Sequence, residues 1–214
     1  MNVYFISGLG ADKRAFQKLT FPKSWTVYHI RYIENLKNEP LADYCKRLAE
    51  QIDTSTPFAL VGLSFGGIIA VELNKIIQPQ MTILISSIST QHQMPSILKI
   101  SGKLKLHSLL PVYFIKQTTA ITFWLFGAKR KFEKDLLIQI IHDTSPKFIK
   151  WAIGKVLTWK NNEKPENLYH IHGTADKLFP ITKVTPDIKI NGGGHFMVLI
   201  QAREISAILS NKLN

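Results

Sequence analysis

The sequence predicts an α/β fold in which helices cover both faces of a doubly wound, mainly parallel β-sheet. Short apolar or β-branched runs, bounded by glycine and proline, alternate with helical patterns along the chain. Such runs suit strands that are buried on both faces, and their alternation with helices is typical of a parallel sheet. About 75 residues after Ile88 then interrupt the alternation. That stretch is too long for a single crossover and indicates an insertion.

Six segments have the composition of strands. They are residues 2–7, 25–30, 57–62, 81–86, 167–172 and, less clearly, 187–191.

Three segments of the predicted core have helical periodicity. Apolar residues between 41 and 52 recur at helical spacing just after Pro40. A second apolar helix is predicted for residues 67–77, ending near a proline, and a third for residues 199–213. The helices and strands together predict a core made of residues 1–90 and 165–214.

Residues 91–164 are predicted to form a helical cap inserted into this core. Breakers at Gly102, Pro111, Gly127, Pro146 and Gly154 divide the segment into about four helices. The most apolar part, residues 109–127, is interrupted by proline, lysine, glutamine and threonine. It falls short of the roughly 20 apolar residues that a membrane span needs.

The charge of the chain is concentrated in the predicted cap. The whole chain carries a net charge of +12, and residues 91–164 hold 13 Lys or Arg against 4 Asp or Glu. We interpret this charge as solvated helix faces, although it also suits an anionic substrate. No zinc-finger spacing or RNA-binding aromatic signature accompanies it, so we expect no nucleic-acid partner. Trp124, Trp151 and Trp159 leave attachment of the cap to acidic membranes open as an alternative.

The single cysteine, Cys45, excludes an internal disulfide and suits a reducing compartment. Its place in a helical pattern is typical of a small core residue. The N-terminal sequence lacks a basic region followed by a long apolar region, so we expect no secretory signal. We therefore expect a soluble, cytoplasmic protein.

The stretch GLSFG, residues 62–66, places Ser64 between a predicted strand and a predicted helix. On so tight a turn the serine hydroxyl is pushed out above the carboxyl end of the sheet. Gly62 and Gly66 would allow the strand and the helix to approach closely. The match is of modest specificity by itself, because the glycines are equally consistent with close packing alone.

Two later segments supply partners that would activate a serine. A base must take the hydroxyl proton, and His195 follows three glycines that come directly after a predicted strand. The base needs a carboxylate, and Asp176 lies in the loop after another strand. The alternative roles are an incidental loop histidine and an Asp that caps a turn.

The loop after the first strand, Ser7-Gly8-Leu9-Gly10, is the candidate for stabilising an oxyanion. The N–H groups of Leu9 and Phe65 are the candidate donors. The loop lacks the third glycine of a dinucleotide-binding motif, and the chain contains no P-loop pattern. We therefore expect no nucleotide cofactor.

His170 and His172 lie two residues apart in a predicted strand and share one of its faces. They are of the type and spacing that could chelate a metal, but no third ligand with convincing spacing is visible. We expect no metal site and no other cofactor.

These motifs together resemble the α/β-hydrolase superfamily. GLSFGG resembles its nucleophile elbow, HGTADKLFP its acid loop, GGGHF its histidine loop and SGLGAD its oxyanion loop. All four occur in the order typical of the family, with a helical cap between them. The resemblance implies Ser64 as nucleophile, Asp176 as acid and His195 as base. Many members have His-Gly where this chain has Ser7-Gly8.

The resemblance also implies a topology. The family's first two strands are missing, which leaves six strands in the expected order 2-1-3-4-5-6. This order reverses between the first and third strands, and open α/β sheets form their ligand crevice at such a point. The loop of Leu9 and the turn of Ser64 follow these two strands.

The implied function is a cofactor-independent serine hydrolase that acts on an ester or thioester of a small acyl substrate. Two alternatives stay open. One is a C–C bond hydrolase or lyase with the same residues, and the other is a ligand-binding protein without turnover.

Overall fold

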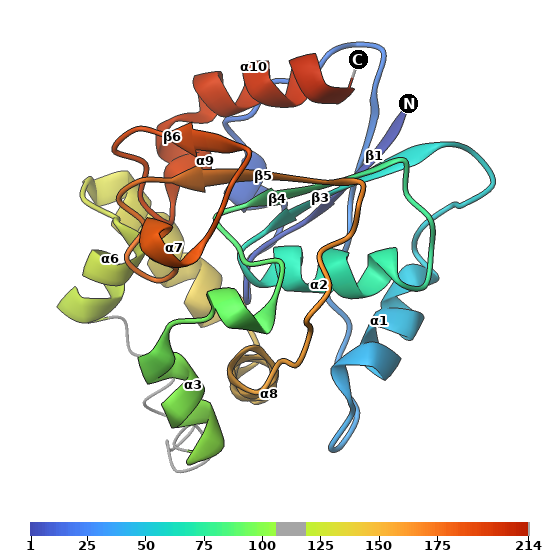
Figure 1. Ribbon diagram of the computed structural model, residues 1–214. Coiled ribbons are helices and arrows are strands. Elements are labelled where there is room, and N and C mark those ends of the chain that lie inside the picture. Colours follow the sequence, from blue (N-terminus) through green and yellow to red (C-terminus); the bar gives the residue numbers. More distant parts are fainter. Residues whose placement is uncertain (106–118, 214) are drawn as a thin grey trace.

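A six-stranded parallel sheet forms the centre of the computed structural model, which describes residues 1–105 and 119–213 (Figure 1). The strand order is β2-β1-β3-β4-β5-β6, as the resemblance to the α/β-hydrolase superfamily implies. The strands are β1 (Asn2–Ile6), β2 (Thr26–His29), β3 (Phe58–Leu63), β4 (Met81–Ile85), β5 (Leu168–Gly173) and β6 (Ile188–Ile190). The expectation of burial on both faces is wrong for β2, because this edge strand alternates exposed and half-buried residues.

The helices follow the predicted pattern with one difference. They are α1 (Leu41–Ala49), α2 (Phe65–Asn74), α3 (Ser96–Lys103), α6 (Ala120–Phe126), α7 (Lys131–Asp143), α8 (Pro146–Leu157), α9 (Met197–Ile200) and α10 (Ala202–Leu213). Three short 3₁₀ turns are η1 (Lys13–Phe16), η2 (Gln91–Gln93) and η3 (Ile181–Lys183). The single helix predicted for residues 199–213 is wrong, because α9 ends at Ile200 and α10 begins at Ala202, with Gln201 between them at φ −114° and ψ 35°.

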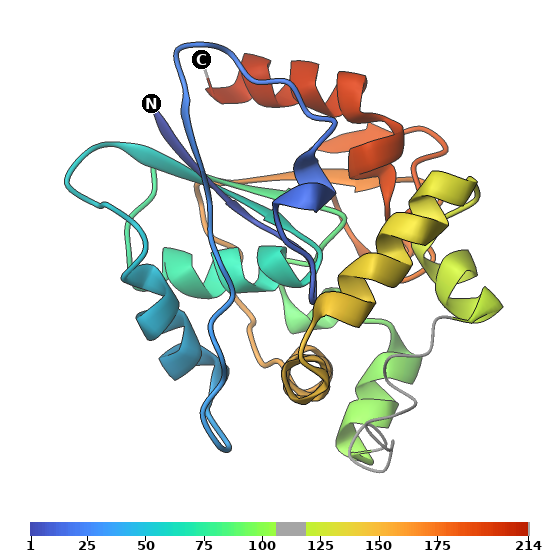
Figure 2. The ribbon, with the colours of Figure 1, turned by 180° about the vertical axis from the view of Figure 1, so that it is seen from behind.

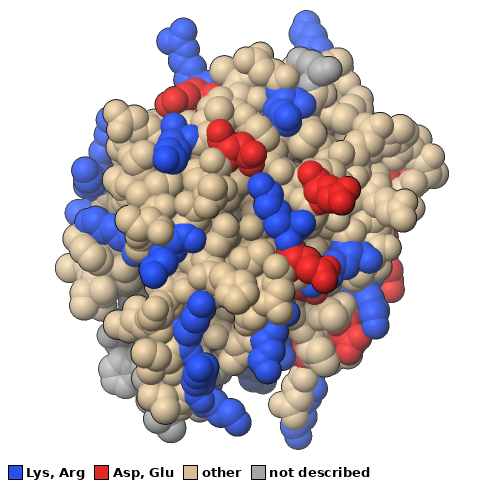
Figure 3. Space-filling view, in the orientation of Figure 1, with Lys and Arg blue, Asp and Glu red and all other residues tan. Residues whose placement is uncertain are grey.

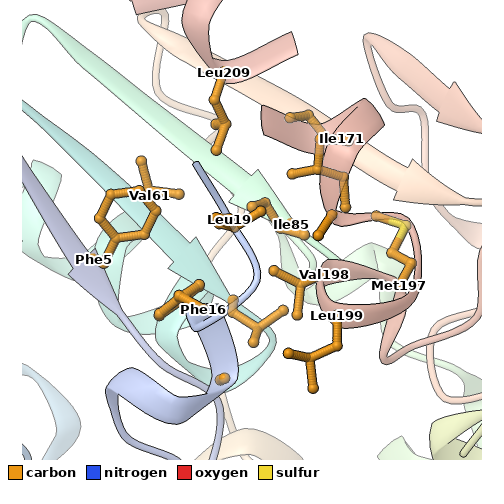
Figure 4. Packing of buried hydrophobic residues seen from close by; sticks show 14 of the residues in the cluster. Phe5, Phe16, Leu19, Val61, Ile85, Ile171, Met197, Val198, Leu199 and Leu209 are labelled. Carbon is orange, nitrogen blue, oxygen red and sulfur yellow. The ribbon is translucent and has the colours of Figure 1, made fainter. Parts of the chain in front are cut away.

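The sheet separates two hydrophobic cores. Val3 and Phe5 of β1 face a core that includes η1, α9 and α10, and Figure 4 shows part of it. Tyr4 and Ile6, which alternate with them, face a core formed with α1 and α2. The views from the two sides show α10 on one face of the sheet and α1 with α2 on the other (Figures 1 and 2). Cys45 lies buried in the second core as a free thiol.

The helices between β4 and β5 contact both cores. Leu136, Leu137 and Ile140 of α7 join the first core, whereas Phe148 and Ala152 of α8 join the second. The region therefore spans the sheet rather than packing on one of its faces. The predicted apolar segment 109–127 lies partly outside the described residues. No helix among the described residues is long and apolar enough to cross a bilayer.

The register of the strands brings the predicted site loops together. Ile6 of β1 pairs with Gly62 of β3, and Leu63 pairs with Ile85 of β4. Because all neighbouring strands are parallel, the residues that follow these positions emerge at the same edge of the sheet. The loop after β1 and the turn after β3 are therefore neighbours.

Candidate active site

Ser64 occupies the turn between β3 and α2 in a backbone conformation that is rare for an L-residue. Its φ is 53° and its ψ is −117°. Three hydrogen bonds hold this conformation. Ser64 N donates to Ile85 O at 3.0 Å, and Ser64 O accepts from Gly67 N at 2.9 Å and from Ser87 Oγ at 2.7 Å. The turn therefore presents the serine side chain at the carboxyl edge of the sheet.

The glycines on either side of Ser64 are required by close backbone contact. A Cβ on Gly62 would collide with the backbone of Gly66, and a Cβ on Gly66 would collide with the carbonyl of Ile6. The turn thus packs directly against the end of β1. The glycines thus allow the strand and the helix to pack closely, and the same close packing places Ser64 on the turn between them.

His195 and Asp176 complete a chain of hydrogen bonds that begins at Ser64. The distance from Ser64 Oγ to His195 Nε2 is 2.8 Å, and His195 Nδ1 lies 2.8 Å from Asp176 Oδ2. The carboxylate can accept but not donate, so His195 Nδ1 carries a proton and Nε2 presents a lone pair to the hydroxyl. The structure thus brings together three side chains that are widely separated in the sequence.

The environment of Asp176 favours its charged form. Burial opposes ionisation, but the adjacent His195, its hydrogen bond and the N–H of Phe179 together hold the pKa of Asp176 below its usual value. The other carboxylate oxygen accepts hydrogen bonds from Leu178 N and Phe179 N, each at 2.9 Å. A buried, ionised carboxylate in this position keeps the imidazole in one tautomer and orientation.

The end of α6 supports the histidine loop. Phe196 N donates to Phe126 O at 3.0 Å, and the Phe126 ring meets His195 edge to face with 5.3 Å between ring centroids. Gly127 ends α6 in the left-handed conformation, and a Cβ at this position would lie 3.5 Å from the Cα of Gly194. The predicted cap therefore contributes to the placement of the base.

The two candidate oxyanion donors belong to residues that border the same cavity as Ser64. Leu9 and Phe65 line one cavity together with Ser64 and His195. Neither the N–H of Leu9 nor that of Phe65 donates a hydrogen bond to any residue that the structure describes. Phe65 is the first residue of α2, so its amide also lies at the positive end of the helix dipole. Two unpaired donors are therefore available beside the serine.

Sequence reasoning missed two residues that hold the loop of Leu9. The hydroxyl of Tyr32 donates to Ser7 O, and Thr144 at the end of α7 lies 2.6 Å from Gly10 O. Burial raises the pKa of Tyr32 well above its ordinary value, so the hydroxyl remains a donor. No local motif marks either residue. Tyr32 lies in an irregular segment after β2, and Thr144 comes from the inserted region.

An apolar cavity of about 310 Å³ lies beside the serine. α7 and α8 supply an aliphatic part of its wall, and α3 and α6 also border it. The residues from α7 and α8 are Leu137, Ile140, Ile141, Ile149, Ile153, Val156 and Leu157. No Lys or Arg lies among the described residues that line it. The cavity can therefore accept an uncharged, apolar group next to Ser64.

A second cavity, of about 680 Å³, shares Gly10 and Ala11 with the first but contains neither Ser64 nor His195. Its wall is more polar and includes Tyr28 and Arg31 from β2 and the segment that follows it. Although this cavity has the larger volume, none of Ser64, His195 and Asp176 lines it.

His170 and His172, considered above as metal ligands, bond to each other and to the acid loop instead. His170 Nε2 lies 3.1 Å from His172 Nδ1, and His172 Nε2 donates to Phe179 O at 2.8 Å. Burial lowers the pKa of both histidines, that of His170 to about 3, so both are neutral. The pair therefore anchors the loop whose backbone binds Asp176.

Comparison with solved structures identifies the class of fold. ClbQ from the colibactin NRPS/PKS pathway is 16% identical, with a TM-score of 0.69 over 99% of this chain and 96% of ClbQ. The meta-cleavage product hydrolase of Pseudomonas fluorescens IP01 is 14% identical, with a TM-score of 0.67 over 100% of this chain and 90% of that chain. An esterase from Thermogutta terrifontis is 14% identical, with a TM-score of 0.65 over 100% of this chain and 89% of that chain.

The chain therefore has the α/β-hydrolase fold, in the form with six parallel strands. No protein-family model matches the sequence. No curated protein matches it by sequence either. The likeness thus concerns the fold, and the function has to be argued from the site.

Proposed function

We propose that the protein is a serine hydrolase that cleaves a carboxylic ester or thioester of a small, apolar acyl group. The observation that carries the proposal is the hydrogen-bonded chain from Ser64 through His195 to Asp176 beside an apolar cavity. Structures of similar fold include an esterase and a meta-cleavage product hydrolase, which supports hydrolytic chemistry on this scaffold.

In the first step, Ser64 Oγ attacks the acyl carbonyl while His195 Nε2 takes the hydroxyl proton. The carbonyl oxygen becomes an oxyanion, which accepts hydrogen bonds from the N–H groups of Leu9 and Phe65. His195 then returns the proton to the departing alcohol or thiol. The products of this step are an acyl-enzyme on Ser64 and the free leaving group.

In the second step, a water molecule donates a proton to His195 Nε2 and attacks the acyl carbonyl. The same two N–H groups stabilise the second oxyanion. Its collapse breaks the bond to Ser64, and His195 returns the proton to Ser64 Oγ. The ionised Asp176 stabilises the imidazolium in both steps.

The cavity defines the acyl group. Its aliphatic wall lacks a charged partner among the described residues, so a carboxylate or phosphate placed there would lose its hydration without compensation. An anionic group of the substrate would therefore have to belong to the leaving group and lie outside the cavity. Each acyl methylene buried in the cavity is worth about 0.8 kcal/mol, which corresponds to about fourfold in kcat/KM.

The experiment is a panel of activated esters and acyl thioesters of increasing chain length, measured with the wild type and with Ser64→Ala. We expect kcat/KM to rise with chain length until the cavity is full, and Ser64→Ala to lose at least 10⁴-fold. A fluorophosphonate should label Ser64 in the wild type. An unlabelled serine together with no turnover on the whole panel would contradict the proposal and favour a ligand-binding protein.

A further inference from the structure

Two helices that border the active-site cavity expose large apolar side chains on their outer faces. Ile97 of α3 is 76% exposed, and Ile121 of α6 is 69% exposed. Ile100, Leu104 at the end of α3, and Trp124 of α6 are also more than half exposed. Among the described residues outside these helices, Leu36 is the one large apolar side chain that is more than half exposed.

These side chains are not part of the faces that pack inward. On α3, Leu98 lines the cavity and Gly102 packs against Leu157 of α8. On α6, Thr122 and Phe126 line the cavity. At 100° per residue, Ile97 and Ile121 lie about 100° around their helices from Leu98 and Thr122, and the other exposed residues lie about 120° or more from the residues that line the cavity. The apolar outer faces are therefore additional to the core and cavity contacts of the helices.

Basic side chains accompany the apolar face of α3. Lys99 and Lys103 lie one turn apart, beside the stripe of Ile97, Ile100 and Leu104, and α3 contains no acidic residue. Figure 3 shows basic side chains over the part of the molecule where α3 lies, whereas the acidic side chains in that view lie over other parts. On α6, the ammonium group of Lys177 lies 4.0 Å from the centre of the Trp124 ring.

We propose that an interfacial patch on α3, made of Ile97, Ile100 and Leu104 with Lys99 and Lys103, attaches the protein to anionic phospholipid bilayers, and that the exposed Ile121 and Trp124 of α6 add to this attachment. Isoleucine, leucine and tryptophan enter the region between headgroups and acyl chains, while lysines beside them reach the lipid phosphates.

The charge of the patch favours a bilayer over a second copy of the chain. A symmetric contact between two copies would bring Lys99 and Lys103 of each copy toward those of the other, with no acidic residue on α3 to pair with them. An anionic bilayer instead attracts each lysine, by about fivefold in affinity. Because α3 and α6 border the cavity that contains Ser64, attachment would place that cavity next to the bilayer.

The experiment measures co-sedimentation of the full chain with vesicles of phosphatidylcholine alone and of phosphatidylcholine with phosphatidylglycerol. We expect binding to the anionic vesicles that weakens as salt is raised. Lys99→Gln with Lys103→Gln should weaken it about 20-fold and reduce its salt dependence. Ile97→Ser with Ile100→Ser should weaken it while leaving the salt dependence in place.

The matched control is Leu36→Ser, which removes an equally exposed leucine outside the patch and should bind as the wild type does. Circular dichroism should show all variants folded, because the substituted side chains are exposed. The proposal is overturned if anionic vesicles do not bind the protein. It is also overturned if Ile97→Ser with Ile100→Ser binds the vesicles as well as Leu36→Ser does. It is also overturned if the wild type is a dimer that Ile97→Ser with Ile100→Ser converts to a monomer. Ser64→Ala should bind like the wild type, so vesicle binding is judged independently of hydrolysis.

Discussion

At the scale of the residue, Ser64 has a strained backbone, and its hydroxyl forms a hydrogen bond with the buried His195. A positive φ at a non-glycine residue costs of order 1–3 kcal/mol and persists when the surroundings hold it in place. Here the hydrogen bond that Ser64 N donates to Ile85 O and those that Ser64 O accepts from Gly67 and Ser87 hold it. The strain therefore serves to aim the hydroxyl at His195, and it should be measurable as a loss of stability.

Replacing Ser64 by glycine should reveal this strain. Both Ser64→Ala and Ser64→Gly lose the hydroxyl, so we expect neither to hydrolyse esters. Glycine adopts φ of 53° without a steric cost, whereas alanine does not. Ser64→Gly should therefore be more stable than Ser64→Ala by about 1 kcal/mol in urea unfolding. Equal stabilities would show that the turn is unstrained.

Tyr32 is expected to act on catalysis through the loop of Leu9. Its hydroxyl holds Ser7 O, and its ring packs against Phe148 of α8 at 5.1 Å between centroids. Tyr32→Phe keeps the ring and removes the hydroxyl, so kcat should fall about tenfold while KM changes little. Tyr28→Phe, at an exposed tyrosine, is the control. A change confined to KM, or one matched by Tyr28→Phe, would contradict a positioning role.

At the scale of the element, α7 and α8 each have two tasks. Ile140 of α7 is part of the first core and also lines the cavity, and on α8 Phe148 joins the second core while the buried Ile149 lines the cavity. Ile153 of α8 and Ile141 of α7 are less buried and complete the cavity wall. The cavity can therefore be reshaped from the less buried positions with little damage to the cores.

Filling the cavity should change substrate selectivity. Ile153→Phe adds bulk on the cavity wall, so kcat/KM for the longest acyl esters should fall at least tenfold while the acetyl ester is hydrolysed nearly as before. Ile138→Phe on α7 makes a similar change at a side chain that is 41% exposed and outside the cavity. The ratio of long-chain to acetyl activity is the measurement. An unchanged ratio in Ile153→Phe would show that the acyl group binds elsewhere.

At the scale of the whole molecule, neutral histidines buried beneath the site couple stability to pH. The folded protein keeps His170 unprotonated down to about pH 3, whereas an unfolded histidine takes up a proton near pH 6.5. Below pH 6.5 the unfolded state therefore binds more protons, and the free energy of unfolding falls as the pH falls. His172, whose pKa burial also lowers, acts in the same direction.

The free energy of unfolding should therefore drop between pH 7 and pH 5. The contribution of His170 to this drop is about 2 kcal/mol. In His170→Gln, urea unfolding at the two pH values should give a drop that is smaller by about this amount, whatever the stability at pH 7. His92→Gln, at an exposed histidine, should leave the drop unchanged. If His170→Gln has the wild-type pH dependence, His170 titrates normally in the folded protein.

Much of this architecture is visible in local patterns. The six strands are found within one residue of the predicted segments, and for the strands buried on both faces the reason is that they require continuous apolar runs. Ser64, Asp176 and His195 are recognisable because glycine-rich and polar loops follow three of these strands. The break at Gln201 escaped prediction, because no glycine or proline marks it in the sequence.

The sequence by itself determined the order of the elements and the residue types available at one edge of the sheet, because periodicity and turn chemistry act over a few residues. The tertiary structure alone decided which distant groups meet. It set Tyr32 and Thr144 on the loop of Leu9 and lined the cavity from α7 and α8. It also linked His170 through His172 to the acid loop. These contacts join segments that are far apart in the sequence. They depend on how the segments pack in the folded protein, and no local sequence pattern encodes that packing.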